Sequence, residues 1–552
     1  MQRALCISVV VLLAGAHAVP RRGLDIAAES DAPQAPPLPG PQQPPAPTAP
    51  ATNGATHPLT VLPQYQLDGL SPAVQRSVVA LVSRGLQVLA EAVHLPGSAP
   101  APLLLPRSCV KVREWARRDG GATTQECIQA CTRFDARPAL RLLLELHETD
   151  LFLRTQAAPA GKCLEATHNA SLFGPVTVCA GERPGNCRVQ PGGTPVLADL
   201  VLYITSASGG VASCGAAVST SSSSSGASAL LAAAGGACET DTKSGRPVAG
   251  AINLCPGRVA ALSSADTWSA DALVTDFLHE MMHVLAFSEG LYRFFPSEGA
   301  GIAAGPDGAL LVSSPAVLGV ARQHFACPAL RGVPLETEGG SGTARTHWRL
   351  RVLNGELMVG TVLTGQRPRL SNFTLAFLQD TGWYAVNYSA AERLTWGAGA
   401  GCAFVTASSC AELASTGFFC SPRAGAVSCT SDHQAVGSCS PLPLTRPGEQ
   451  CFAIIPYSNW LCRDAALQNA DRSLWGYSFG PGGRCIAAGA TPWSRADGAV
   501  LYTQDNAVPG CFATRCNASG ALFVSIDNVQ IACPQGQRIE LSSVKGAGEL
   551  RG

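Results

Sequence analysis

The feature that most constrains the fold is a polar motif inside an apolar stretch, HEMMH at residues 279–283. On a helix, residues four apart share one face, so the imidazoles of His279 and His283 can reach a single zinc ion. The neighbouring Phe277 and Val284 are apolar, and a histidine–glutamate pair buried among such residues is costly unless something satisfies it. The pattern therefore favours a zinc site on a buried helix over a pair of structural histidines.

Glu280, inside this motif, has the chemistry of a general base. Zinc lowers the pKa of a bound water to about 7, and a neighbouring carboxylate can take up the proton that this water releases. The carboxylate can then pass the proton to a leaving amine. The motif thus predicts a hydrolysis in which Glu280 moves protons and does not hold the metal.

A third protein ligand has to come from elsewhere in the chain, because two histidines provide only half of a tetrahedral site. In the common pattern HExxHxxGxxH, a glycine and a third histidine follow closely, but Ala286 and Glu289 stand at those positions here. The histidines further downstream are His324, His347 and His433. Spacing alone does not choose among them.

The N-terminus has the pattern of a secretory signal peptide. Arg3 precedes a short apolar stretch at residues 5–13, and the small residues around position 17 suit cleavage after Ala18. The apolar stretch is shorter than the roughly 20 residues that cross a bilayer, which disfavours a membrane anchor. Residues 544–552 lack the hydrophobic tail of a GPI signal. We therefore expect a protein of the secretory pathway, extracellular or associated with the cell surface, without a transmembrane segment.

Cysteine content and glycosylation sequons agree with this compartment. The chain has 22 cysteines, of which only Cys6 lies in the predicted signal peptide, so an odd number, 21, remains. Most are expected to form disulfides, with at least one thiol left over. The net charge of +0 gives no indication of nucleic-acid binding. The candidate N-glycosylation sites are Asn169, Asn372, Asn387 and Asn517.

Hydrophobic periodicity places several elements. A Ser-Pro step at its start and apolar residues at helical spacing predict an amphipathic helix over 72–94, and Ser269 is predicted to cap the helix that carries the motif. Residues 199–205 and 246–254 are predicted as strands. The Ser/Ala/Gly-rich stretch 219–236 is predicted as a flexible surface insertion away from the active site.

Further segments give the chain a specific resemblance. They include residues 105–109 (LPRSC), 246–254 (RPVAGAINL), 324–327 (HFAC), 346–348 (THW), 354–358 (NGELM), 379–384 (QDTGWY) and 456–459 (PYSN). With the HExxH motif, they make the chain resemble the leishmanolysin family of zinc metallopeptidases, which are metzincins, and especially its invadolysin-like members. The resemblance covers roughly residues 105–462.

The resemblance implies that His347 is the third zinc ligand and that Met358 is the methionine of the Met-turn below the metal. One Zn²⁺ per chain is expected, with His324 as the rival ligand. The implied fold is α+β, with a metzincin-type catalytic domain that has a long insertion between the second and third zinc histidines. A disulfide-rich, mostly β or irregular C-terminal domain follows. Family members usually have glycine where Ala286 stands, so the helix is expected to end differently here, or the glycine to be dispensable.

Composition and resemblance together predict five segments and a boundary near residue 395. They are a signal peptide (1–18), a Pro/Ala-rich linker or short pro-segment (19–57), an N-terminal and catalytic subdomain with the HExxH helix (58–288), an insertion with the third-ligand and Met-turn subdomain (289–395), and a cysteine-rich C-terminal domain (396–552). The C-terminal domain holds 11 of the cysteines, and most of them are expected to be paired.

The predicted function is that of a secreted zinc metalloendopeptidase acting on polypeptides, with Glu280 as general base. The alternative is a secreted adhesion or binding glycoprotein that keeps the fold with little or no peptidase activity. The presence of Glu280 argues against this alternative, because metal binding alone does not require it. No cysteine precedes Cys109 in the predicted mature chain, so control by a pro-segment thiol is not expected.

Overall fold

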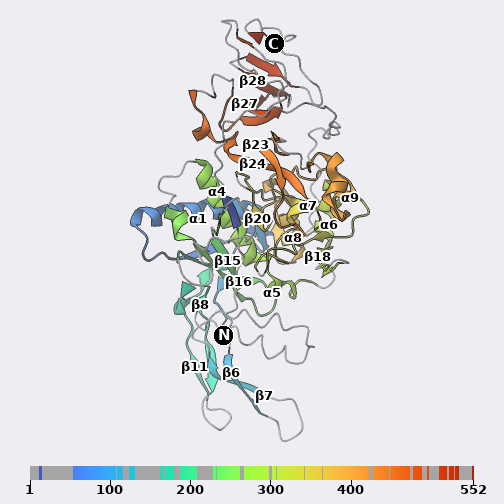
Figure 1. Ribbon diagram of the computed structural model, residues 1–552. Helices are drawn as coiled ribbons and strands as arrows, with labels where there is room; N and C mark the ends of the chain where they lie inside the picture. Colours follow the sequence, from blue (N-terminus) through green and yellow to red (C-terminus); the bar gives the residue numbers. More distant parts are fainter. Residues whose placement is uncertain are drawn as a thin grey trace.

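The computed structural model describes residues 54–106 and 162–533, with internal gaps of which the largest is 208–227, and four strands outside those ranges. These strands are β1 (Val11–Ala14), β6 (Cys109–Trp115), β7 (Thr124–Ala130) and β30 (Leu550–Arg551). Figure 1 shows a central body of helices and strands, with the β6–β7 hairpin at one end. The mixture of helices and strands agrees with the predicted α+β class.

A four-stranded sheet in the order β15-β16-β13-β3 lies beside the candidate site. Its strands are β3 (Val61–Gln66), β13 (Leu200–Thr205), β15 (Ala233–Thr240) and β16 (Pro247–Leu254). β3, β13 and β16 run parallel, whereas β15 pairs with β16 in the antiparallel direction at the edge. β13 and β16 are buried along their whole length, as expected of strands covered on both faces. Both predicted strands are confirmed.

Two long helices pack against each other near this sheet. α1 (Pro72–Ala92) begins as predicted, because the Ser71 hydroxyl accepts a hydrogen bond from the Val74 backbone N–H. α4 (Thr267–Leu285) carries the HExxH motif and contacts both α1 and β15. Ser269 lies within α4, so the prediction that it caps this helix was wrong. A glycine in α1 allows the close approach, since a Cβ added at Gly85 would lie 2.3 Å from the Phe277 ring.

The Ser/Ala/Gly-rich stretch 219–236 ends in the sheet next to α4, which corrects its prediction as a surface insertion away from the active site. Residues up to 227 lie outside the described residues, but β14 (Ser228–Leu231) and β15 follow them. A Cβ added at Gly235 would lie 2.8 Å from the Cβ of Glu280. Here, small residues serve the close approach of a strand to a helix and do not indicate flexibility.

Short elements follow α4 in the chain, and they lie on both sides of His347 in the sequence. They are α5 (Glu289–Tyr292), β17 (Ile302–Ala304), β18 (Leu310–Val312), α6 (Pro315–His324), β19 (Val333–Pro334), α7 (Leu350–Leu353), β20 (Thr361–Val362), α8 (Asn372–Asp380) and β21 (Ala385–Val386). β17, β18 and β19 form one small sheet, and α6 packs on α8.

The other described elements are short strands and turns around this body. Before α4 they are β2 (Thr56–Pro58), β4 (Val93–Pro96), β5 (Pro102–Leu103), β8 (Lys162–Cys163), β9 (Ala166–Thr167), β10 (Val176–Cys179), β11 (Cys187–Gln190), β12 (Val196–Leu197) and α3 (Pro256–Ala260). After residue 395 they are α9 (Cys402–Thr406), β22 (Val427–Cys429), β23 (Ala435–Pro441), β24 (Phe452–Leu461), β25 (Gly483–Ala487), β26 (Ser494–Arg495), β27 (Pro509–Cys516), β28 (Leu522–Ile526) and β29 (Val529–Ala532).

Disulfides staple the C-terminal part. Nine of its 11 cysteines are paired, in Cys327–Cys402, Cys410–Cys451, Cys420–Cys439, Cys429–Cys485 and Cys462–Cys511. This confirms that most of the 11 are paired, and Cys516 and Cys533 are free among the described residues.

The main hydrophobic core extends from Leu59 to Ala453 and so crosses residue 395; the domain boundary near residue 395 stays a prediction. In the part of the chain that the structure describes, no helix has the length and apolar character to cross a membrane.

Candidate metal centre

The side chains of His279, His283 and His347 converge on one point. Their Nε2 atoms are 3.0 Å apart for His279 and His347, and 3.1 Å apart for each pair that includes His283. All three residues are buried. In a tetrahedral site with bonds of about 2.0–2.1 Å, zinc separates its imidazole nitrogens by about 3.3–3.4 Å, so this arrangement has the dimensions of a zinc site.

The opposite ring nitrogens show which tautomer each imidazole adopts. The Nδ1–H of His279 donates to the Leu357 carbonyl at 2.7 Å, that of His283 to Phe287 at 2.7 Å, and that of His347 to Thr343 at 2.9 Å. Carbonyl oxygens only accept, so the proton is on Nδ1 and each Nε2 has a free lone pair. Three lone pairs facing one another repel unless a cation lies between them. The donor set therefore fits a metal ion.

Burial keeps these imidazoles neutral. It lowers the pKa of His279 to about 4, and it holds the pKa values of His283 and His347 well below that of an ordinary histidine. The mutual repulsion of the charged forms acts in the same direction for His283 and His347. Because a metal binds only the neutral imidazole, the three histidines are in the ligand form throughout the neutral pH range.

Glu280 lies on the same helix and is fully buried. The Gly235 backbone N–H acts on its carboxylate, but neither carboxylate oxygen has a hydrogen bond of good geometry among the described residues. Burial, followed by the charge of Asp276 one turn earlier, raises the pKa of Glu280 well above its usual value, and the Gly235 N–H acts in the opposite direction. A buried carboxyl group with so little hydrogen bonding is costly in a core, which points to a role in proton transfer.

The end of α4 explains how this chain manages without the usual glycine. Ala286 does not have a positive φ, so it does not adopt the left-handed conformation that favours glycine. Instead, the backbone N–H groups of Ala286 and Phe287 both donate to the Met282 carbonyl, each at 2.9 Å. This turn directs the Phe287 carbonyl back to His283. Position 286 therefore needs no left-handed residue in this chain, and both expectations at this position stay predictions.

The third histidine is held by a loop with long-range contacts. Gly339, Gly340 and Gly342 have positive φ, which turns the chain before His347. The His347 carbonyl accepts from the Glu336 N–H at 2.8 Å, and Trp348 N–H donates to the Met358 carbonyl at 2.7 Å. His347 thus depends on partners on both sides of it in the sequence.

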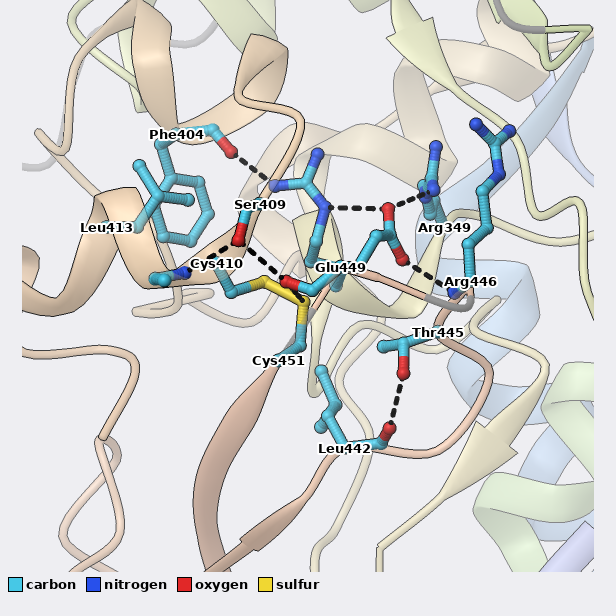
Figure 2. The surroundings of a disulfide bond; sticks show 12 residues. Arg349, Phe404, Ser409, Cys410, Leu413, Leu442, Thr445, Arg446, Glu449 and Cys451 are labelled. Carbon is cyan, nitrogen blue, oxygen red and sulfur yellow. Dashed lines mark hydrogen bonds and ion pairs between the residues drawn. A yellow bond between two sulfur atoms is a disulfide. The ribbon is translucent and has the colours of Figure 1, made fainter. Parts of the chain in front are cut away.

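A buried ion cluster fixes the chain just after His347, and Figure 2 shows it beside the Cys410–Cys451 disulfide. The Glu449 carboxylate pairs with Arg349 and lies 3.7 Å from the Arg351 Nε. The Glu449 backbone carbonyl accepts from the Cys410 N–H at 2.8 Å. Both arginines are buried, so the loop that carries His347 is tied to the disulfide-stapled region about 100 residues later.

The other predicted site residues lie in different settings. Met358 is fully buried, and it follows the Leu357 carbonyl that binds His279. His324 Nε2 donates to the Trp396 carbonyl at 2.8 Å, and His433 Nδ1 donates to the Cys485 carbonyl at 2.8 Å, so neither joins the cluster. Glu356, Glu449 and Gly235 were not predicted as site residues. Only the unusual Gly235-Gly236 pair, which lies within β15, could have indicated close packing.

The fold and the site define a class of protein whose metal centre is built on an HExxH helix and completed by a distant histidine. The chain belongs to the leishmanolysin family, because the model of that family (peptidase M8) matches residues 198–552. This confirms the resemblance found in the sequence.

Similar proteins include peptidases from several organisms. A "Leishmanolysin-like peptidase" of Drosophila melanogaster is 31% identical over 262 residues, covering 40% of this chain and 35% of its own length. "Ciliated left-right organizer metallopeptidase" of Homo sapiens is 30% identical over 335 residues, 56% of this chain and 41% of its own. "Leishmanolysin" of Leishmania major is 29% identical over 345 residues, 56% and 54% respectively. The chain thus spans about a third to about half of the length of these curated relatives.

Proposed function

We propose that this chain is a zinc-dependent metalloendopeptidase that hydrolyses peptide bonds in proteins. The observation that carries the proposal is the convergence of three buried Nε2 lone pairs, two of them from the helix that also carries Glu280. The names of the relatives, which are peptidases and metallopeptidases, support the same activity. Since the chain covers only part of those relatives, activity, substrates and partners are proposals here.

A zinc ion held by His279, His283 and His347 supplies the Lewis acid for this reaction. Glu280 takes a proton from the attacking water as the water oxygen bonds to the peptide carbonyl carbon. It then gives this proton to the peptide nitrogen, so that the C–N bond breaks and a neutral amine leaves. The raised pKa of Glu280 suits a carboxyl group that has to hold a proton and release it in one cycle.

The proposed substrate is an extended polypeptide. β15 lies at the edge of its sheet and packs on α4, so a polypeptide can add to the sheet as a further strand next to Glu280. Met358, buried after the turn at Leu357, is proposed to form the floor of the pocket without binding the metal.

The test is hydrolysis of an unfolded protein substrate by the wild type and by the Glu280→Gln variant, with zinc content measured on the same samples. Loss of the general base should lower kcat by roughly 10²–10⁴-fold, with one zinc per chain retained in both. Glu289→Gln is the matched control, because this glutamate follows the helix and its side chain is 39% exposed. A wild type that binds zinc and cleaves no protein would favour the adhesion glycoprotein instead.

We further propose that the protein acts in the secretory pathway or outside the cell, after removal of residues 1–18. The disulfides support an oxidising compartment. All four candidate asparagines are at least partly exposed, but Asn372 begins α8 and its Oδ1 atom is buried, unlike Asn169, Asn387 and Asn517. Mass spectrometry of the secreted protein after enzymatic deglycosylation should find these last three sites modified. Unmodified asparagine at all of them would contradict this location.

A further inference from the structure

The peptide group between Leu357 and Met358 is hydrogen-bonded on both sides. Its carbonyl oxygen accepts the Nδ1–H of His279 at 2.7 Å. Its N–H donates to the Oε2 atom of Glu356 at 2.5 Å. Because the two groups belong to one planar, conjugated unit, the Glu356 carboxylate is linked to the imidazole of His279 through a single peptide.

The Glu356 carboxylate is fully buried, and its hydrogen-bond donors are neutral. Its Oε1 atom accepts from the Ser371 hydroxyl at 2.9 Å and the Thr374 hydroxyl at 2.7 Å. Burial raises the pKa of Glu356 to about 7, although these hydrogen bonds act in the opposite direction. No lysine or arginine is among the groups that bond it in the described part of the chain, in contrast to Glu449 with its two arginines.

The other two histidines have no such link. The carbonyl that holds His283 belongs to the Phe287–Ser288 peptide, whose N–H donates to the Ala286 carbonyl at 2.8 Å. The carbonyl that holds His347 belongs to the Thr343–Ala344 peptide, whose N–H donates to the Gly340 carbonyl at 3.0 Å. Of the three supporting peptides, the one at His279 alone is bonded to a carboxylate.

A carboxylate at the N–H of a peptide polarises that peptide and makes its carbonyl a stronger acceptor. The stronger acceptor fixes the ring of His279 and increases the basicity of its Nε2 atom, which is how carboxylates that bond directly to metal-binding histidines act. A dication at the three histidines would also favour a negative charge at Glu356, which bonds no lysine or arginine in the described part of the chain. Geometry and charge therefore agree.

We propose that Glu356 is a positioning residue for the metal centre, acting on His279 through the Leu357–Met358 peptide. The inference rests on the proposed zinc site. The hydroxyl groups of Ser371 and Thr374 anchor the Glu356 carboxylate to the start of α8, where Ser371 is the N-cap. Thr374 also accepts from the Trp348 indole N–H at 3.2 Å, so the same network reaches the residue next to His347.

The test compares Glu356→Gln with Asp199→Asn. Asp199 is also buried, directly before β13, and its carboxylate accepts the Thr60 backbone N–H at 2.8 Å and bonds the His57 Nε2 atom at 3.1 Å. Neither partner bonds a ligand Nδ1. The control therefore removes a buried carboxylate charge without touching the link to His279. Glu356→Asp, which keeps the charge, is the rescue variant.

Three properties are measured on each variant: the zinc dissociation constant of the metal-free protein by competition with a chromophoric chelator, the visible spectrum of the cobalt(II)-substituted protein, and thermal unfolding without metal. Glu356→Gln should weaken zinc binding by roughly 10–100-fold and shift the cobalt bands. Asp199→Asn should change thermal unfolding while its zinc affinity and cobalt spectrum stay near wild type. Glu356→Asp should recover part of the affinity.

Two results would overturn the proposal. One is a folded Glu356→Gln variant with zinc affinity and cobalt bands like those of Asp199→Asn. The other is a Glu356→Gln variant that does not fold, since the role of the carboxylate would then be structural. Failure of the proposed function is distinguishable, because it would appear in the wild type as absent hydrolysis or absent zinc binding.

Discussion

The two halves of the proposed metal centre are built in different ways. On α4, two histidines and Glu280 lie within one turn, and the carbonyl that holds His283 is four residues away in the same turn. His347 lies in a loop whose position depends on Glu336, Met358 and, through Arg349, Glu449. The helix half is therefore specified locally, whereas the loop half depends on partners up to about 100 residues away. Changes to each half should have different consequences.

The largest effect should follow from removing the loop ligand. His347→Ala should weaken zinc binding by at least about 1,000-fold, because the ligands of a zinc site share a binding free energy of roughly 10–16 kcal/mol. His324→Ala is the control, since this half-buried histidine bonds the Trp396 carbonyl outside the cluster. Chelator competition measures both. Retained affinity in His347→Ala together with loss in His324→Ala would reverse the ligand assignment.

The next largest effect should follow from breaking the ion cluster that supports the loop half. Glu449→Ala should lower the free energy of unfolding by about 3–5 kcal/mol, because it leaves two buried arginine charges uncompensated. Glu392→Ala, which breaks a pair with Arg367 where the glutamate is 41% exposed, should cost only about 0–1 kcal/mol. Denaturant unfolding of the metal-free proteins measures the difference. Equal effects would show that the cluster does not support the loop.

A smaller effect should appear on the helix half. Gly235→Ala places a Cβ 2.8 Å from the Glu280 Cβ and 3.1 Å from its Oε2 atom, so the carboxylate has to move. A displacement of about 1 Å can lower a rate by roughly 100-fold, and we expect a loss of kcat of about 10–100-fold with zinc retained. Gly319→Ala on α6 is the control, because no atom lies within 4 Å of its added Cβ, and its kcat should stay near wild type. Normal kcat in Gly235→Ala would contradict the packing argument.

The smallest effect concerns the end of α4. Ala286→Gly restores the residue that the family usually has, but Ala286 does not need positive φ here. The substitution should lower the free energy of unfolding by about 0.5–1 kcal/mol through chain entropy and give no gain in kcat. Calorimetry and kinetics of this one variant check both statements. A more active variant would indicate that the alanine strains the active site.

Much of the helix half could be predicted from the sequence alone. Apolar residues at spacings of three and four predicted a buried helix with two histidines on one face, and α4 has this form. The strands at 199–205 and 246–254 were predictable for a similar reason, since continuous apolar runs of that length suit buried strands. These patterns are local, and a local pattern is visible in any single sequence.

The loop half could not be derived in this way. His347 is 64 positions after His283, and no helix or strand period relates the two residues. Its choice rested on family resemblance, and its role as a ligand stays a proposal. The link from Glu356 through a peptide to His279 was invisible as well, because it depends on the direction of one backbone carbonyl. The position of β15 against Glu280 was missed because glycine and alanine indicate both flexible chain and tight packing.

The central claim is that one zinc ion is held by three imidazoles, two from the helix and one from the loop. X-ray absorption spectroscopy at the zinc edge of the purified, zinc-loaded protein tests it most directly. The account predicts first-shell nitrogen or oxygen scatterers at about 2.0–2.1 Å, with the outer-shell pattern of three imidazole rings in the wild type and two in His347→Ala. Sulfur scatterers at about 2.3 Å, or an unchanged imidazole number in His347→Ala, would contradict it.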